Sequence, residues 1–512
     1  QVTQSPFAPC ASEQFCGRQA EREKIMSALE GGPGVIVAAP HGAGKSSLLE
    51  WAASEIGDRG WPLLRAGTES WVLGWLELEP SAGQAGDSAR QALEHPAAEH
   101  ALAIIRDALQ SVSLEAGTEA SREAMEALRA LWREGSLPAE LPAAWAELVL
   151  ALTSQQPPGQ RLCLLVDEAE WAGDVPWARL LQSDSLWLGV ACEEGPGSGA
   201  TVGALEAAGL SLVRLGRPSP AEIAEMAERR GGRRLAPGVA EAVAARADSP
   251  FAVMAWLQSE GAKPRPSFLA AAMYLEGRPE GEQQAAQAGC LVPGWFSIGL
   301  IAAMLVRSPN AVRETLWGSP LFVQMSSQRY AFAHPLLRGA IQATLTTEQA
   351  AELHKRAAEW LLAQERPGGA ASLAQLSVHH HGARQAKEGF AANLAWARHC
   401  LRWGLLRCGL EAAQRALLCA AWEESPDHQL GAMALNAILL LALGSASEAD
   451  TMAQRAASLA RDAKNASAEI LCLTARALAQ RDSDPSKSRE LLERARAAAR
   501  AHHLEPLLEG FS

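Results

Sequence analysis

A stretch of small and polar residues, AAPHGAGKSS at 38–47, has the composition of a phosphate-binding loop. It follows GVIVAAP (34–40), typical of a buried strand, and leads into SSLLEWAASEI (46–56), which has a helical pattern. The spacing Ala39-x4-Gly44-Lys45-Ser46 is that of a phosphate loop with Ala in its first position. Small residues let successive backbone N–H groups surround phosphate oxygens, and the helix dipole adds to the attraction. The predicted nucleotide-binding residues of the loop are His41, Gly42, Ala43, Gly44, Lys45, Ser46 and Ser47.

Four side chains would supply the chemistry. Lys45 can reach the β and γ phosphates, and Ser46 can offer a hydroxyl to Mg²⁺. A second apolar run, RLCLLVDEAEW (161–171), ends in Asp167 and Glu168. Asp167 would bind Mg²⁺ through water, whereas Glu168 would orient or deprotonate the attacking water. The sequence therefore predicts a nucleoside triphosphate site with Mg²⁺ on Ser46 and Asp167, and with Lys45 and Glu168 as catalytic residues.

The elements that must position these residues form an α/β pattern. Three more short apolar runs, at 62–66, 186–191 and 211–215, are separated by helical stretches, which predicts a parallel sheet. The segment 67–158 is interpreted as a helical insertion before the acidic strand. From about 348 the pattern is helical, and AAQRAL at 412–417 recurs as MAQRAA at 452–457 and LLERAR at 491–496. Such a period indicates stacked helical repeats, with a plain helical bundle as the alternative.

Composition limits the class of protein. The 512 residues carry a formal charge of −12, which argues against broad nucleic-acid binding. Nine scattered cysteines without a CxxC pair favour a reducing cytoplasm, and no apolar run is long enough to span a membrane. The initial Gln and the lack of a signal-peptide pattern suggest a fragment of a longer protein. Three consecutive histidines, 379–381, favour a solvated helix end over a metal site.

Beyond the phosphate loop, FCGRQAEREKIMSALEGGPGVIVAAPHGAGKSSLL (15–49) resembles the STAND class of signal-transducing P-loop ATPases, especially the large ATP-binding LuxR-type regulators. The resemblance implies that the box containing Phe15 and Arg18 packs beside adenine. It continues through LGRPSPAEIAEMAERRGG (215–232), similar to a first lid helix, and ADSPFAVMAWLQ (247–258), where Pro250 would contact the nucleotide. The segment 288–345 is similar to a winged helix, in which His334 would contact the β-phosphate of ADP.

These patterns together predict an α/β parallel-sheet P-loop NTPase core followed by a helical lid, a winged helix and an all-α repeat domain. The expected limits are a tail at 1–13, the core at 14–217, the lid at 218–264, the winged helix at 265–347 and tetratricopeptide-like repeats at 348–512. The resemblance implies ATP or ADP with Mg²⁺, slow hydrolysis, and a switch controlled by a protein or small molecule on the repeats. It also implies nucleotide-dependent self-association and a fused or partner output domain.

Two alternatives stay open. The first is a DNA-associated ATPase of the origin-recognition type, disfavoured because NAVRETLWGSPL (310–321) holds only one Arg beside one Glu and the chain is acidic. The second is a repeat scaffold with a structural nucleotide site. The sequence departs from the STAND pattern after its fourth strand, where Cys192, Glu193 and Glu194 replace a polar or Arg sensor of the γ-phosphate. Carboxylates there would repel the phosphate and slow its hydrolysis.

Overall fold

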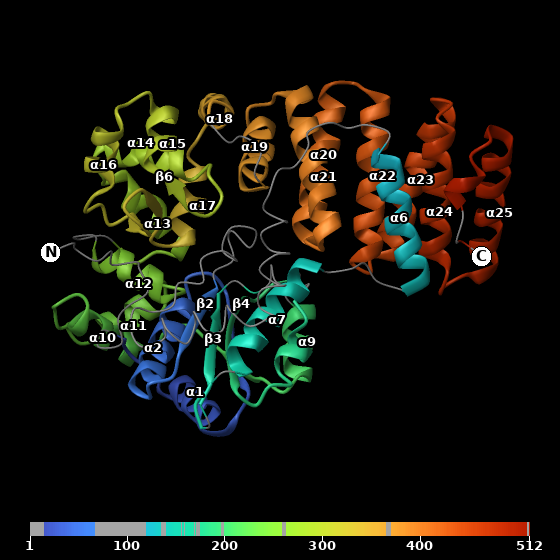
Figure 1. Ribbon diagram of the computed structural model, residues 1–512. Coiled ribbons are helices and arrows are strands. Elements are labelled where there is room, and N and C mark those ends of the chain that lie inside the picture. Colours follow the sequence, from blue (N-terminus) through green and yellow to red (C-terminus); the bar gives the residue numbers. More distant parts are fainter. Residues whose placement is uncertain are drawn as a thin grey trace. The chain divides into compact units, whose positions relative to one another are not determined.

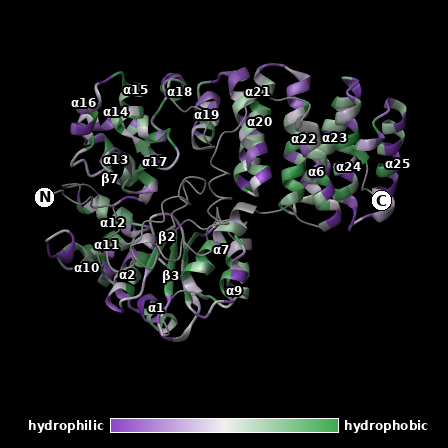
Figure 2. Ribbon diagram, viewed as in Figure 1, coloured by the Kyte–Doolittle hydropathy of each residue, from purple (hydrophilic) through white to green (hydrophobic). Residues whose placement is uncertain are grey.

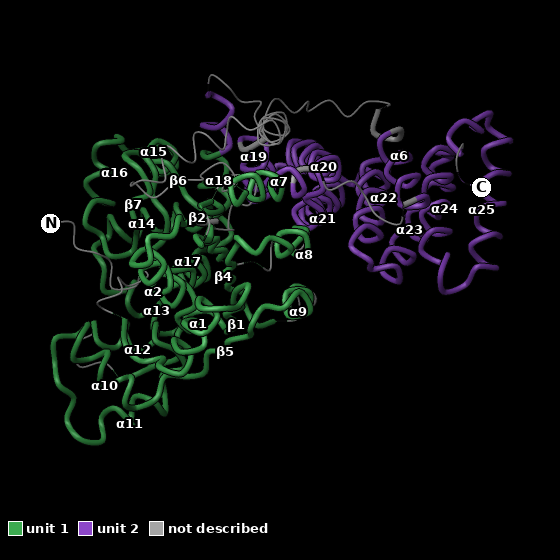
Figure 3. Tube along the Cα trace, turned by 60° about the horizontal axis from the view of Figure 1, so that its bottom comes forward, with its two compact units in different colours: residues 1–102, 145–357 green, residues 103–144, 358–512 purple. Residues whose placement is uncertain are grey.

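The computed structural model describes most of the chain, in two compact units. The described residues are 15–66, 119–134, 140–154, 156–157, 159–167, 169, 175–195, 199–258, 263–364, 370–508 and 511. Unit 1 contains residues 1–102 and 145–357, and unit 2 contains residues 103–144 and 358–512 (Figure 3). The predicted tail at 1–13 lies outside the described residues, and the domain limits given above remain predictions.

A parallel five-stranded sheet forms the centre of unit 1 (Figure 1). The strands follow the order β2-β3-β4-β1-β5, and all pairs are parallel. All five predicted strands are confirmed: β1 Gly34–Ala39, β2 Leu63–Ala66, β3 Leu162–Val166, β4 Leu186–Glu193 and β5 Ser211–Arg214. Because β1 and β3 are buried along their whole length, they appear in the sequence as continuous apolar runs rather than as alternating ones.

Helices cover this sheet and fix the ends of its strands. They are α1 Gln19–Gly31, α2 Lys45–Asp58, α7 Glu140–Ser154, α8 Trp177–Leu180 and α9 Gly199–Ala207. Ile25 of α1 and Leu48 and Ile56 of α2 are fully buried in one core cluster with Val35 and Val37 of β1. This packing holds the loop between β1 and α2 at the carboxyl edge of the sheet, where parallel sheets bind their ligands.

The rest of unit 1 is mainly helical, with a small second sheet. Its elements are α10 Pro220–Arg229, α11 Val239–Ala244, α12 Pro250–Leu257, α13 Ser267–Glu276, α14 Glu280–Gly289, β6 Phe296–Ser297, α15 Ile298–Leu305, α16 Pro309–Leu316, β7 Phe322–Gln324, β8 Arg329–Phe332 and α17 Pro335–Gln342. The strands form an antiparallel sheet in the order β6-β8-β7. Proline opens α10, α12 and α16 after a serine whose hydroxyl caps the helix.

Unit 2 consists of helical hairpins. After α18 Thr347–Leu362, whose end belongs to this unit, its helices are α19 Ala370–Gly382, α20 Ala386–Trp403, α21 Leu406–Trp422, α22 Pro426–Ala442, α23 Ala446–Asp462, α24 Ala466–Gln480 and α25 Pro485–His502, followed by a 3₁₀ turn, Glu505–Leu508. The first helices of the hairpins, α20, α22 and α24, begin 40 residues apart. The predicted helical repeat is therefore confirmed, and α22 and α24 are rich in apolar residues (Figure 2).

The three consecutive histidines correct one prediction. They lie in the last turn of α19, where His379 is 0% and His380 6% exposed. His380 Nδ1 is 2.6 Å from Gln385 Oε1, and the His381 ring stacks on Trp422. The prediction of a solvated helix end is thus wrong. The last turn of α19 is buried because this helix packs against α20 and α21. No group of three His, Cys, Asp or Glu within the described ranges could hold a metal ion.

One helix of the insertion before β3 belongs to unit 2. Helix α6, Glu119–Glu134, packs against α22 and α24 (Figures 1 and 3). The helical character of the insertion is confirmed for α6 and α7. Nothing in the sequence pattern pointed to the packing of α6 on the repeats. Within the described part of the chain, no helix has the length and apolar character needed to cross a membrane.

Asn393 tests the packing of the first hairpins. Its buried amide donates to the carbonyls of Ser377 (2.7 Å) and Gly389 (2.8 Å) and accepts from Arg415 Nε (2.9 Å), which joins α19, α20 and α21. Replacing it by Leu leaves these groups unpaired in the interior. We expect Asn393→Leu to destabilise unit 2 by about 2–4 kcal/mol in urea denaturation. An unchanged urea midpoint would contradict the expected contribution of this amide to stability.

Candidate nucleotide-binding site

The loop between β1 and α2 depends on two glycines with left-handed backbone. Gly42 has φ +79° and Gly44 has φ +96°, a conformation that favours glycine. Gly44 caps α2, and the first residue of the helix is Lys45. The loop thus ends at a helix N-terminus whose free N–H groups favour an anion.

Lys45, Ser46 and Asp167 lie together at the start of α2. Lys45 is 8% exposed, and its ammonium donates to the carbonyls of Ala39 (2.9 Å) and Pro40 (3.2 Å). The Ser46 hydroxyl donates to Asp167 Oδ2 at 2.5 Å. The structure therefore brings together the two oxygen donors predicted for Mg²⁺. Glu168, predicted to act on the attacking water, lies outside the described residues.

Two further helix N-termini approach the loop at Gly42. A Cβ atom built at this glycine would lie 2.8 Å from Leu336 Cδ1 and 3.2 Å from Ser249 Oγ. The N–H of Phe251 donates to the Gly42 carbonyl at 3.3 Å. Ser249 caps α12, and residue 336 lies in the first turn of α17. The positive ends of α2, α12 and α17 therefore converge on one loop, which strengthens its attraction for phosphate.

His334 is the cap of α17 and carries an unusual pKa. Its Nδ1 accepts a hydrogen bond from the N–H of Leu336 at 3.1 Å, and its ring packs on Phe251 with centroids 4.6 Å apart. Burial, together with the nearby charges of His41 and Lys45, lowers the pKa of this imidazole to about 3. Because Nδ1 accepts, the neutral ring carries its proton on Nε2. His334 can therefore donate one hydrogen bond beside the phosphate loop without adding charge.

A pocket beside the loop contains most of the residues predicted to surround the base. It encloses about 460 Å³ of space, part of it open to solvent. Its lining residues come from the first box, the loop and the segment around α10: Phe15, Cys16, Arg18, Ala43, Gly44, Ser47, Pro218, Glu222, Met226, Arg230 and Pro250. The Phe15 ring is 6% exposed and lies 6.2 Å from the Trp51 ring. The pocket has the mixed polar and apolar lining of a small-molecule site.

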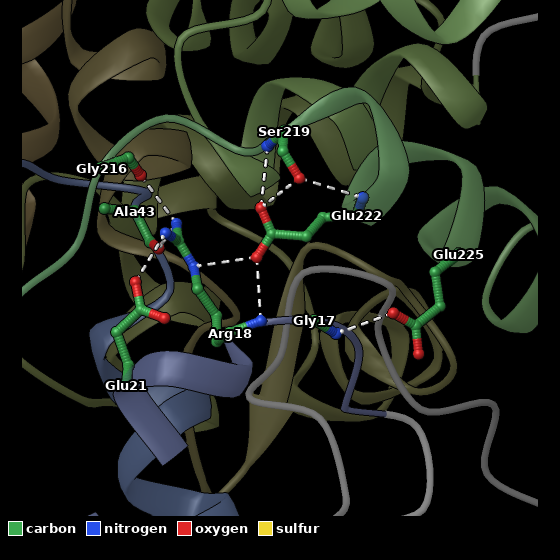
Figure 4. Close-up of polar contacts among 8 residues, drawn as sticks. All are labelled: Gly17, Arg18, Glu21, Ala43, Gly216, Ser219, Glu222 and Glu225. Atoms are coloured by element: carbon green, nitrogen blue, oxygen red, sulfur yellow. Dashed lines mark hydrogen bonds and ion pairs between the residues drawn. The ribbon is translucent and has the colours of Figure 1, made fainter. Parts of the chain in front are cut away.

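Arg18 connects three walls of this pocket (Figure 4). Its guanidinium donates to the carbonyls of Ala43 (3.3 Å) and Gly216 (2.7 Å), and its backbone N–H donates to Glu222 Oε1 at 2.8 Å. The neighbouring N–H of Gly17 donates to Glu225 Oε2 at 3.0 Å. Burial raises the pKa of Glu222, but hydrogen bonds from Ser219 and Arg18 outweigh it, and the pKa lies below its ordinary value. The carboxylate stays ionised and anchors the box to α10.

The acidic side chains at the end of β4 and directly after it form pairs of their own. His41 Nε2 lies 2.7 Å from Glu193 Oε2, and Arg214 Nε lies 3.0 Å from Glu194 Oε1. His41 was predicted to bind the nucleotide. It is half-exposed at the side of the loop, and its partner is the carboxylate that replaces the expected sensor. Glu193 thus has a partner in the loop itself.

Several lining residues were missed from the sequence. Glu222, Met226 and Arg230 belong to or directly follow α10, and Phe251 and Leu336 contact the loop from α12 and α17. One signal was available: Ser219 and Glu222 have the spacing of a capping box, which both side chains complete. That pattern locates the start of α10, but it does not show that the same Glu222 also holds Arg18.

The close approach at Gly42 can be tested against a matched glycine. Gly60 has a similar φ of +69°, but a Cβ atom there would meet nothing within 4 Å. We expect Gly60→Ala to cost about 1 kcal/mol of stability from backbone strain alone. Gly42→Ala should cost roughly 1–3 kcal/mol more, because Leu336 and Phe251 must move. Urea denaturation of both variants gives the difference, and equal losses would contradict the crowding at residue 42.

The lowered pKa of His334 predicts a pH dependence. The folded ring takes up a proton only near pH 3, whereas the unfolded ring does so near 6.5. Stability from this group is therefore complete above pH 6.5 and is lost as pH falls toward 3, at roughly 1 kcal/mol per pH unit. We expect the stability of His334→Gln to fall less than that of the wild type between pH 7 and 5 in chemical denaturation. Parallel curves would contradict the assignment.

Comparison with known proteins gives one family match. Residues 14–183, about a third of the chain, match the family model of the AAA ATPase domain. A comparison with curated proteins returned no match.

Several solved structures are similar over much of the chain. One is a Signal Transduction ATPase with Numerous Domains (STAND) protein with a tetratricopeptide repeat sensor from Pyrococcus horikoshii, with 13% identity, TM-score 0.42, and coverage of 99% of this chain and 80% of that one. Another is Cdc6p from Pyrobaculum aerophilum, with 10% identity, TM-score 0.30, and coverage of 66% and 96%. A third is the Aeropyrum pernix Orc1 protein in complex with DNA, with 11% identity, TM-score 0.27, and coverage of 64% and 93%.

All three TM-scores are below 0.5, so we base no conclusion about function on these likenesses. The family match and the geometry of the phosphate loop agree with each other. Both confirm the predicted P-loop core. Residues 14–183 are therefore an AAA ATPase domain, and its phosphate loop, the candidate nucleotide site, lies at the carboxyl edge of the parallel sheet.

Proposed function

We propose that the protein is a nucleotide-dependent signal-transducing switch of the STAND class, held closed by ADP and opened by exchange for ATP. The observation that carries this proposal is the convergence of α2, α12 and α17 on Gly42. A nucleotide in the site would contact the parallel-sheet domain and the N-termini of α12 and α17 at the same time. Binding would therefore favour the arrangement that brings all three together, as a two-state switch requires.

The site supports ADP as the closing ligand. Lys45 and the loop N–H groups would hold the β-phosphate, and the neutral His334 would donate its Nε2–H on the same side. The base would enter the pocket that Phe15, Arg18 and Pro250 line. The helices α14, α15 and α16 with the sheet of β6, β7 and β8 support the assignment of the last segment as a winged helix, and we propose that it acts as the moving part.

The same geometry supports slow hydrolysis of ATP. The hydroxyl of Ser46 and the carboxylate of Asp167 are hard oxygen ligands, and the 2.5 Å contact between them supports a Mg²⁺ site that both residues would share. When bound, Mg²⁺ would neutralise charge on the β and γ phosphates. Lys45 would hold the transferred phosphate, and Glu168 would orient the water. Glu193 and Glu194, already paired with His41 and Arg214, offer no positive charge to the γ-phosphate, which favours a long-lived bound state.

The helical repeats would receive the signal. We propose that a protein or small molecule binds them, that opening permits self-association, and that an output domain is fused or recruited. The reducing cytoplasm is the expected compartment, and no disulfide joins the described cysteines.

The nucleotide released from the purified chain tests the proposal. We expect near-stoichiometric ADP after denaturation of the wild type, almost none from Lys45→Ala, and a reduced amount from His334→Ala. His334→Gln is the matched control, because its amide can also donate a hydrogen bond without charge.

Other outcomes point to other functions. An empty site with rapid ATP turnover would contradict the ADP-held switch and favour a cycling ATPase. An empty site without any ATP binding would leave the repeats as the functional part.

A further inference from the structure

Helix α6 is amphipathic, and its apolar face is covered. Met125, Leu128 and Leu131 are at most 4% exposed, and Ala124 is 9% exposed. On the other side of the helix Glu126 and Arg133 are exposed. The buried positions follow the spacing of one helix face, as expected for a helix that lies in a groove. The covering surface belongs to α22 and α24 of the repeats.

Polar and aromatic contacts hold both ends of α6. In its first turns, Glu123 accepts from Arg398 of α20, with a shortest distance of 2.7 Å. Toward its C-terminal end, the Trp132 ring meets the Phe511 ring edge-on at 5.9 Å, and the Trp132 carbonyl accepts from Arg481 at 2.5 Å. The Arg481 guanidinium also lies 4.9 Å from the Trp132 ring centroid. The groove therefore recognises an acidic residue, an apolar stripe and an aromatic residue in a fixed order.

Helix α6 is not a member of the repeats that it covers. The hairpins α20–α21, α22–α23 and α24–α25 succeed one another along the chain, whereas α6 comes from the segment between β2 and β3 of the sheet. At 16 residues, an isolated helix is marginal in water, so α6 gains its stability from the groove. These features are those of a ligand helix supplied by the same chain.

We propose that the groove on α20, α22 and α24 is the binding site for an amphipathic helix of a partner protein, and that α6 is its internal substitute. The partner helix carries a carboxylate in its first turns for Arg398, apolar residues spaced three and four apart, and an aromatic residue near its end for Arg481 and Phe511. Because α6 is tethered, it competes at a high effective concentration, and the partner must bind tightly to displace it.

The position of α6 in the chain connects its displacement from the groove to the candidate nucleotide site. The helix is followed by α7 and β3, and Asp167, the residue paired with Ser46, comes directly after β3. Release of α6 from the groove would loosen the tether to the strand that carries this carboxylate. This last step rests on the proposed function, but the exchange in the groove does not.

A labelled peptide tests the exchange directly. The probe is the capped, fluorescein-labelled segment 119–134, titrated with the full chain and followed by anisotropy. We expect weak binding to the wild type, because α6 occupies the groove. Leu128→Asp in the full chain should raise the affinity at least about tenfold, because a buried charge expels the internal helix. Arg133→Asp, which places the same carboxylate on the exposed side, is the matched control and should bind as the wild type does.

A charge exchange shows whether the probe occupies the same groove. In the Leu128→Asp chain, adding Arg398→Glu should weaken probe binding about tenfold, and a probe with Glu123→Arg should recover it. Glu123→Arg in the full chain breaks the ion pair without burying a charge, and should raise the affinity for the unaltered probe by a few fold even if Leu128→Asp fails to fold. The proposal would be overturned if the wild type and the Glu123→Arg chain bound the probe with equal affinity. It would also be overturned if Arg398→Glu left the affinity for the probe unchanged. No nucleotide enters these titrations, so their outcome is separate from that of the ADP measurement.

Discussion

The nucleotide site depends on the absence of a side chain at residue 42. With only a hydrogen there, the loop turns through a left-handed conformation and admits α12 and α17 to within van der Waals contact. Their approach brings His334 close to Lys45 and His41, and that proximity contributes to the low pKa of the imidazole. The loop directly follows β1, and this strand is buried at every position, which fixes the start of the loop. Gly42 therefore allows α12 and α17 to approach the phosphate loop.

The wall of the pocket beside the phosphate loop has a different origin, since it joins parts of the chain about 200 residues apart. The backbone of Gly17 and Arg18 is held by Glu225 and Glu222, and the guanidinium of Arg18 returns to the carbonyls of Ala43 and Gly216. Charged hydrogen bonds of this kind are strong when they are partly buried. The segment around Gly17 and Arg18, the phosphate loop and α10 are thus joined by hydrogen bonds into one unit.

The sequence predicted those features that are encoded locally. Continuous apolar runs located all five strands of the sheet, and the spacing around Lys45 located the phosphate loop, because both depend on neighbouring residues. Partners distant in sequence could not be derived: nothing near Glu222 indicates that it holds Arg18. The prediction for the histidines of α19 was wrong for the same reason, since their burial depends on packing against α20, which the local sequence does not show. The packing of α6 on α22 and α24 depends on surfaces that come together only in the folded chain.

The packing of α6 also affects the order in which the protein can fold during synthesis. The helix ends at residue 134, and its first main partner, α22, begins at residue 426. At about 5–20 residues per second, roughly 15–60 s pass before that partner has been made. Throughout that interval the stripe of Met125, Leu128 and Leu131 has no groove to enter. The nascent chain is therefore exposed to aggregation at this stripe, and a fragment ending before the repeats would carry the same apolar surface permanently.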